Sequence, residues 1–149
     1  MPDTSKQNVL IVDDERNMCE LLEAALRLRG FEPQWRTSAE EGFVAVQQEA
    51  FDVVLTDLKM PKVDGIEFCE RIVANRPDIP VIVMTAFGSM ETAVAAIRAG
   101  AYDFVTKPIE MEMLALTLQR AIRHRELQEQ VKVLSAAVSR SERFDDMIG

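Results

Sequence analysis

Carboxylates, a threonine and a lysine follow apolar runs at four separate points of the chain. The residues that end these runs, or follow them directly, are Asp13, Asp14, Asp57, Thr85 and Lys107. Three carboxylates brought close together cannot all stay ionised unless cations compensate their charge. Hard carboxylate oxygens without a histidine suit magnesium better than zinc. These residue types therefore predict a Mg²⁺ site, with Lys107 as a further positive charge.

The elements that must position these residues alternate in type. Five short segments rich in β-branched or aromatic residues predict strands at 8–13, 32–36, 51–57, 79–85 and 102–107. Three of them are continuous apolar runs, which suit strands buried on both faces. Between them, patterns of helical period predict helices at 16–29, 39–49, 65–75 and 89–99. This order predicts an α/β fold with a parallel sheet, right-handed crossovers and helices on both faces.

Local signals sharpen some of these boundaries. Gly30 and Gly100 close two of the helices, and Ser38 is the expected N-cap of a third. A proline directly after Lys107 can be cis, which would fix a tight turn that aims the lysine. From Glu110 onward no proline or glycine occurs before Gly149. We expect a long helix from 110 to about 138, followed by a polar linker or fraying end.

In an open parallel sheet, ligands bind at the carboxyl ends of the strands. Asp13 and Asp14 taken alone could simply cap the next helix, and Glu15 is expected to do only that. With Asp57, Thr85 and Lys107 at the matching strand ends, a shared site is the better interpretation.

Length, charge and cysteine content limit the class of protein to which the chain can belong. The chain has 149 residues, enough for one domain, and a net charge of −8, which argues against nucleic-acid binding through broad positive charge. Cys19 and Cys69 lack metal-type spacing and are expected to be buried reduced thiols, as in cytoplasmic proteins. The start is polar, without a signal peptide, and no apolar run approaches the roughly 18 residues of a membrane helix.

Three stretches together resemble the receiver domains of bacterial two-component response regulators. They are "VLIVDDE", "DVVLTDLKMPKVDGIEF" and "VIVMTAFGSMETAVAAIRAGAYDFVTKP". The resemblance covers roughly 8–124 and implies a flavodoxin-like (βα)5 doubly wound sheet in the order 2-1-3-4-5. It implies a receiver domain at 1–124 and a helical linker at 125–149.

The same resemblance implies a role for each site residue. Asp57 would accept a phosphoryl group from a sensor histidine kinase. Asp14, Asp57 and the backbone carbonyl of Lys59 would hold Mg²⁺, with Asp13 acting through water. Thr85 and Lys107 would contact the phosphoryl oxygens. Phe104 occupies the position of the switch aromatic and would respond to movement of Thr85, although it cannot donate a hydrogen bond. Such a domain is a switch and not an enzyme beyond self-phosphorylation and slow autodephosphorylation.

Three other classes of protein share some of these features. A nucleotide hydrolase would need a G-x-x-x-x-G-K-[ST] loop, which the chain does not contain. An aspartyl-nucleophile phosphatase would need a second aspartate two residues after the nucleophile, where this chain has Lys59. A purely protein-binding domain with a degenerate site would not need the intact set of acids, threonine and lysine.

The stretch "TAFGSMETAVAAIRAGAYDFVTKP" is most similar to receivers of the nitrogen-regulation type, which precede an ATPase domain in sigma-54-dependent activators. The closing "MIG" resembles the opening of that ATPase domain. A receiver with a different output domain, or with none, is the alternative. On either interpretation we expect a cytoplasmic protein, without direct nucleic-acid binding by this part of the chain and without membrane contact.

The expected last helix also carries a repeat of apolar residues. Leu127, Val131, Leu134 and Val138 are spaced four, three and four apart, as in the a/d seam of a coiled coil. The pattern predicts a homodimer through this helix, the receiver, or both. The alternative is that the seam packs on its own domain or on the ATPase domain.

Overall fold

The computed structural model describes residues 7–60, 64–86 and 90–148, with side chains as far as 134. Five strands form one sheet in the order β2-β1-β3-β4-β5, and every pairing is parallel. The strands are β1 (Gln7–Val12), β2 (Phe31–Arg36), β3 (Val53–Asp57), β4 (Val81–Thr85) and β5 (Asp103–Thr106). The flavodoxin-like order expected from the resemblance is therefore confirmed.

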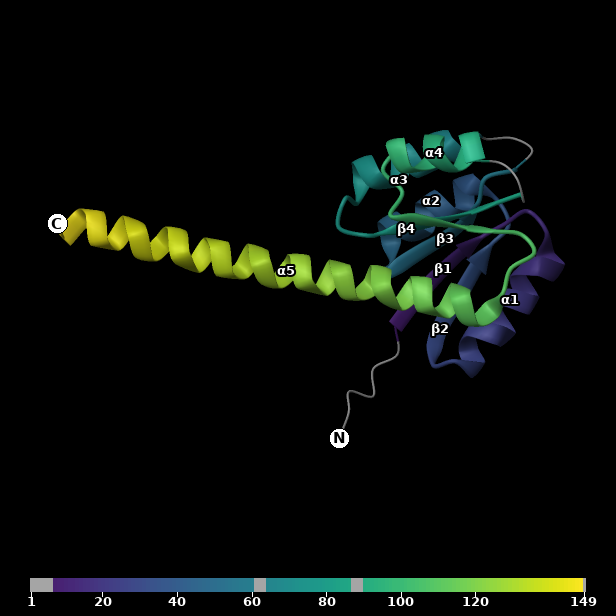
Figure 1. Cartoon of the computed structure of the whole chain (residues 1–149), viewed down its shortest axis with the longest axis horizontal. Helices are drawn as coiled ribbons and strands as arrows, with labels where there is room; N and C mark the ends of the chain where they lie inside the picture. Colours follow the sequence, from purple (N-terminus) through teal and green to yellow (C-terminus); the bar gives the residue numbers. More distant parts are fainter. Residues whose placement is uncertain (1–6, 61–63, 87–89, 149) are drawn as a thin grey trace.

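Helices cover both faces of this sheet (Figure 1). They are α1 (Arg16–Leu28), α2 (Ala39–Gln48), α3 (Gly65–Asn75), α4 (Met90–Arg98) and α5 (Met111–Ile148). The core is split by the sheet into two clusters of buried side chains. One cluster joins the sheet to α1 and α5, and the other joins it to α2, α3 and α4.

The central strands are buried because both of their faces are covered. Every residue of β3 and β4 is buried, as the continuous apolar runs predicted. The edge strands β2 and β5 are largely half-buried or exposed. The last four residues of β1 are buried as well, so the carboxyl ends of β1 and β3 both follow buried strand segments.

Most boundary signals are confirmed. The Ser38 hydroxyl accepts a hydrogen bond from the Glu41 N–H at 3.1 Å, and the Lys107–Pro108 peptide bond is cis. Gly30 and Gly100 adopt positive φ angles of 92° and 109° after their helices, a conformation that favours glycine. The expected start of the fourth helix, position 89, lies outside the described residues.

The end of the last helix was predicted wrongly. Instead of ending near 138, α5 continues to Ile148 and projects away from the sheet (Figure 1). The polar residues after 138 suit a linker or a fraying end, but serine, arginine and acidic residues also cost little in a helix. Within the described ranges, no helix combines the length and apolarity that a membrane crossing requires.

Gly65 begins α3 where the helix passes closest to the end of β3. A Cβ at this position would overlap the backbone Cα and carbonyl oxygen of Leu58, which follows Asp57. Since backbone cannot rotate aside as a side chain can, only glycine fits without displacement.

We predict that Gly65→Ala lowers the free energy of unfolding by about 1–3 kcal/mol, the usual range for overpacking. Urea unfolding measures this change, and Glu67→Ala on the exposed side of the same helix is the control. Equal stability of the two variants would contradict the close packing.

Candidate functional site

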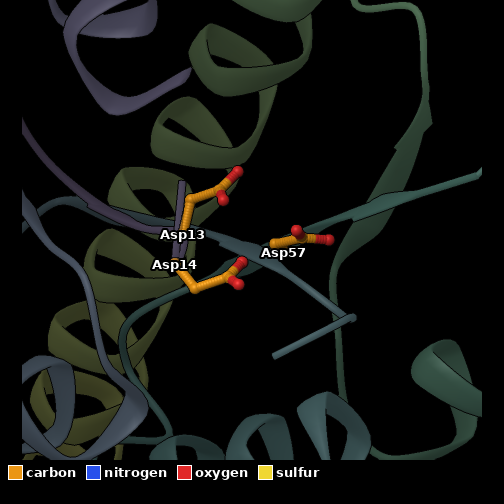
Figure 2. A group of neighbouring side chains, drawn as sticks. All are labelled: Asp13, Asp14 and Asp57. Atoms are coloured by element: carbon orange, nitrogen blue, oxygen red, sulfur yellow. The ribbon is translucent and has the colours of Figure 1, made fainter. Parts of the chain in front are cut away.

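Three carboxylates converge at the carboxyl ends of β1 and β3 (Figure 2). Asp13 and Asp14 directly follow β1, and Asp57 is the last residue of β3. One oxygen from each of Asp13, Asp14 and Asp57 lies within 4.8 Å of the others. The strands are parallel neighbours, so residues 43 or more positions apart meet at one edge, as predicted.

Asp13 is the most deeply buried of the three, with no exposed surface. Its Oδ1 accepts a hydrogen bond from the Glu15 N–H at 2.9 Å, while Oδ2 is buried without a partner among the described residues. Burial raises the pKa of Asp13 from 3.8 to about 6, and the nearby charge of Asp57 adds to that effect. The Lys107 charge and the Glu15 hydrogen bond oppose it.

Asp57 is 5% exposed and has both carboxylate oxygens engaged. Oδ1 accepts from the Lys59 N–H at 3.1 Å, and Oδ2 accepts from the Lys107 ammonium at 3.2 Å. The lysine follows β5 and reaches across β4 to the end of β3. The predicted placement of Lys107 beside the acids is therefore correct.

Thr85 ends β4, next to Met84, which pairs with Asp57 in the sheet register. Its hydroxyl is buried and has no hydrogen-bond partner among the described residues. The Thr85 carbonyl accepts from the Lys107 N–H at 2.8 Å, which ties the two strand ends together. A buried hydroxyl with unused bonding capacity is available for a group that enters the site.

Phe104 lies on β5 opposite Val83, and Thr106 lies opposite Thr85. Since side chains alternate along a strand, Phe104 and Thr85 project to the same face of the sheet at diagonal positions. Phe104 is half-buried against the cluster shared with α2, α3 and α4. This arrangement is compatible with the predicted switch pair, whose movement stays a prediction.

Glu15 occupies the N-cap position of α1, but its side chain makes no capping hydrogen bond. The Glu15 backbone N–H instead donates to Asp13, so Glu15 contributes to the acidic cluster as well as standing at the helix N-terminus. Lys59 likewise contributes its N–H, and an isolated antiparallel bridge pairs it with Asp64. The Lys59 carbonyl as a metal ligand stays a prediction.

The donor set fits a hard divalent cation. It consists of carboxylate oxygens alone, and the Asp13 Oδ2 atom is buried with no partner among the described residues to offset its desolvation. A cation would remove this cost as well as the repulsion between the acids.

Some groups that contact or surround the three carboxylates were not predicted from the sequence. The N–H groups of Glu15 and Lys59 and the close approach of Gly65 depend on backbone conformation, which residue types do not report. Cys19, predicted only as a buried thiol, donates from its Sγ to the Asp13 carbonyl at 3.3 Å. Both cysteines are buried and free, as expected.

Comparison with known proteins identifies the family and supports the fold. The family described as response regulator receiver domain matches residues 9–119. The "Transcriptional regulatory protein ZraR" of Salmonella typhimurium is 40% identical over 133 residues, which are 89% of this chain and 30% of that protein. The "Regulatory protein AtoC" of Escherichia coli is 37% identical over 138 residues, 93% of this chain and 30% of that protein. The chain thus spans about 30% of the length of these relatives.

Solved structures show the same similarity. A crystal structure of NtrX from Brucella abortus in complex with ADP aligns with a TM-score of 0.83 and 32% identity, covering 87% of this chain and 30% of that one. A CheY-like receiver domain from Methanospirillum hungatei aligns with a TM-score of 0.78 and 28% identity, covering 83% of this chain and 99% of that one. With its acidic edge, its strand order and these matches, the chain belongs to the response regulator receiver domain family of two-component systems.

Proposed function

We propose that this receiver domain is a phosphorylation-controlled switch in which Asp57 accepts the phosphoryl group from a sensor histidine kinase. The supporting observation is the environment of Asp57. Its buried carboxylate lies against the Lys107 ammonium. The neighbouring strand ends at Thr85, whose buried hydroxyl has no hydrogen-bond partner among the described residues. A nucleophile, a cation and a free donor for phosphoryl oxygens are the parts that phosphoryl transfer requires.

In the proposed transfer, an Asp57 carboxylate oxygen attacks phosphorus while the bond from phosphorus to the donor's histidine nitrogen breaks. The product is an acyl phosphate, and the nitrogen leaves with the bonding pair. Lys107 would move its contact from the carboxylate to a phosphoryl oxygen, and Thr85 would donate to another. The Lys59 N–H holds the second carboxylate oxygen and so orients the nucleophile.

Asp14, Asp57 and the Lys59 carbonyl would hold Mg²⁺, with Asp13 acting through water. When bound, Mg²⁺ neutralises charge on the carboxylates and on the phosphoryl oxygens. Among the chain's own groups, Lys107 and the two backbone N–H donors perform the same task in part.

Phosphorylation adds roughly one to two negative charges and three acceptor oxygens at this edge. If Thr85 moves toward them, Phe104 on the same face of the sheet can fill the space that it leaves. This would change the surface formed by α4, β5 and α5, as a shift between two states.

We further propose that residues 1–124 are the receiver and that 125–149 link it to an output domain of a sigma-54-dependent transcriptional activator. The support is similarity to proteins named as transcriptional regulators, of which this chain spans about 30%. A receiver with another output domain, or none, is the alternative. Sequence beyond Gly149 tests this, since an ATPase domain would begin with a phosphate-binding glycine-rich loop. We propose that this signalling takes place in the cytoplasm. The only reactions that we propose for the chain are its own phosphorylation from a phosphodonor and a slow autodephosphorylation.

The linker helix is proposed to pair with that of a second chain. Leu127, Val131 and Leu134 are 47%, 60% and 64% exposed in the single chain, which supports a partner outside the receiver over packing on its own domain. A seam that packs on the ATPase domain stays the alternative. The Val138 side chain lies outside the described residues. An exposed apolar stripe on a projecting helix favours a helical partner.

We predict that acetyl phosphate with magnesium adds a single phosphoryl group, and that Asp57→Asn abolishes it because the amide is not a nucleophile. Intact-mass measurement follows the addition. Asp103→Asn, at the amino end of β5 and so at the opposite end of that strand from Lys107, is the matched control and should be labelled like the parent. Strong labelling of Asp57→Asn would refute the assignment.

Without divalent ions, we predict that the stability contributed by Asp13 is lost as pH rises from about 4 to about 6. The folded-state pKa of Asp13, about 6, lies above its ordinary value of 3.8, so the folded state binds more protons in this window. Urea unfolding in chelator measures the slope, and Asp13→Asn should flatten it. Added magnesium should stabilise the parent more at about pH 8 than at about pH 5, because it binds ionised carboxylates. Equal slopes for parent and Asp13→Asn would contradict this prediction.

We predict that the chain sediments as a dimer at micromolar concentration and that Leu127→Asp plus Leu134→Asp makes it monomeric, since charges in an apolar seam oppose pairing. Glu126→Asp plus Glu129→Asp changes neighbouring exposed positions and is the control. A monomeric parent, with or without phosphorylation, would rule out the helix pair. A dimer that survives the double aspartate variant would move the interface to the receiver.

A further inference from the structure

Arg125 of α5 forms two ion pairs at the end of the sheet opposite the acidic site. Its Nη1 donates to Asp52 Oδ1 at 3.0 Å, and its Nη2 donates to Asp78 Oδ2 at 3.4 Å. Asp52 precedes β3, and Asp78 lies between α3 and β4. One guanidinium therefore joins the last helix to two separate loops. We call Asp52, Asp78 and Arg125 the base clamp.

Both aspartates are held from their other side as well. Asp52 Oδ2 accepts from the Asn8 N–H of β1 at 2.7 Å. Asp78 accepts from Arg76 Nε at 3.1 Å and from Arg76 Nη2 at 3.0 Å. Arg76 lowers the pKa of Asp78 below its ordinary value, and Arg125 adds a smaller effect, so the carboxylate stays ionised. The base clamp is thus anchored to the sheet and to the end of α3.

The clamp residues are shielded from solvent in part, with side chains between 25% and 29% exposed. Ion pairs in such positions are screened less than those on an open surface. The planar fork of arginine can engage two carboxylates at once, which a lysine ammonium cannot do with the same geometry.

The clamp lies at the point where α5 leaves the domain. Side chains of α5 as far as Ile122 contribute to the core. Every described side chain of this helix from 126 to 134 is exposed. Beyond Arg125 the helix extends for roughly 35 Å at about 1.5 Å per residue. A tilt of about 10° at Arg125 would therefore displace its far end by about 6 Å.

We propose that the base clamp is a positioning device that fixes the direction in which α5 leaves the receiver. The apolar contacts of α5 are non-directional and allow small sliding movements. The two ion pairs are directional and lead to different loops, so they oppose tilting of α5 in two different directions. Because the clamp lies away from Asp57, it can be altered without changing the phosphorylation site.

The experiment measures the distance between spin labels at Gln47→Cys on α2 and Gln130→Cys on α5, both at exposed positions. The native Cys19 and Cys69 are buried, and their pKa values are raised to about 12 and about 11, so labelling stays at the introduced thiols. Labelled chain is diluted with unlabelled chain, so that distances between chains contribute little. Pulsed electron resonance then gives the distance distribution.

We expect a single narrow distribution in the parent and in Arg123→Gln, an exposed position on the same helix. Arg125→Gln should broaden or shift it. Hydrogen exchange of the α5 amides around Arg125 should become roughly 10- to 100-fold faster, the effect of losing a charged hydrogen bond, while amides of β3 stay unchanged.

The double variant Asp52→Asn plus Asp78→Asn removes the clamp from the domain side and should reproduce the effect. It also decides the test if Arg125→Gln does not fold, as judged by circular dichroism. Distributions and exchange rates equal to the parent in the folded clamp variants would overturn the proposal. Neither outcome depends on phosphorylation, so the proposed function is tested separately.

Discussion

Placing three carboxylates, two of them buried, at one edge of the sheet is the constraint on which the candidate site depends. Asp13 has no exposed surface, its Oδ2 has no partner among the described residues, and an Asp57 oxygen lies within 4.8 Å of an oxygen of each of the other two acids. Desolvation and repulsion both oppose this arrangement, as the raised pKa of Asp13 reflects. The N–H groups of Glu15 and Lys59 and the ammonium of Lys107 offset it in part. The remaining imbalance is what the proposed cation and phosphoryl group would offset.

The buried strands beneath this edge fix the positions of its residues. β3 and β4 are wholly buried, so their carboxyl ends cannot shift without disturbing both core clusters. β5 is less buried and carries Phe104 next to the strand of Thr85. We therefore expect local stability to be greatest in the buried strands beneath Asp57 and lower in the half-buried edge strand β5.

α5 connects the two ends of the sheet. It begins shortly after Lys107, packs across one face, and reaches the base clamp at Arg125 before it leaves the domain. The acidic edge and the base clamp are therefore joined by one continuous helix. This is the element through which the proposed phosphorylation of Asp57 would act on the projecting helix.

The sequence by itself determined the fold class and the members of the acidic site, because apolar runs mark buried strands and parallel strands end at one edge. It located Asp13, Asp14, Asp57, Thr85 and Lys107 correctly relative to the strand ends. It did not predict the true end of α5, since polar residues suit a linker and an exposed helix equally well. Only the tertiary structure decided the N–H contacts of Glu15 and Lys59 and the pairing of Arg125 with Asp52 and Asp78. Such contacts join residues far apart in the chain, or depend on local backbone conformation, and neither leaves a periodic pattern in the sequence.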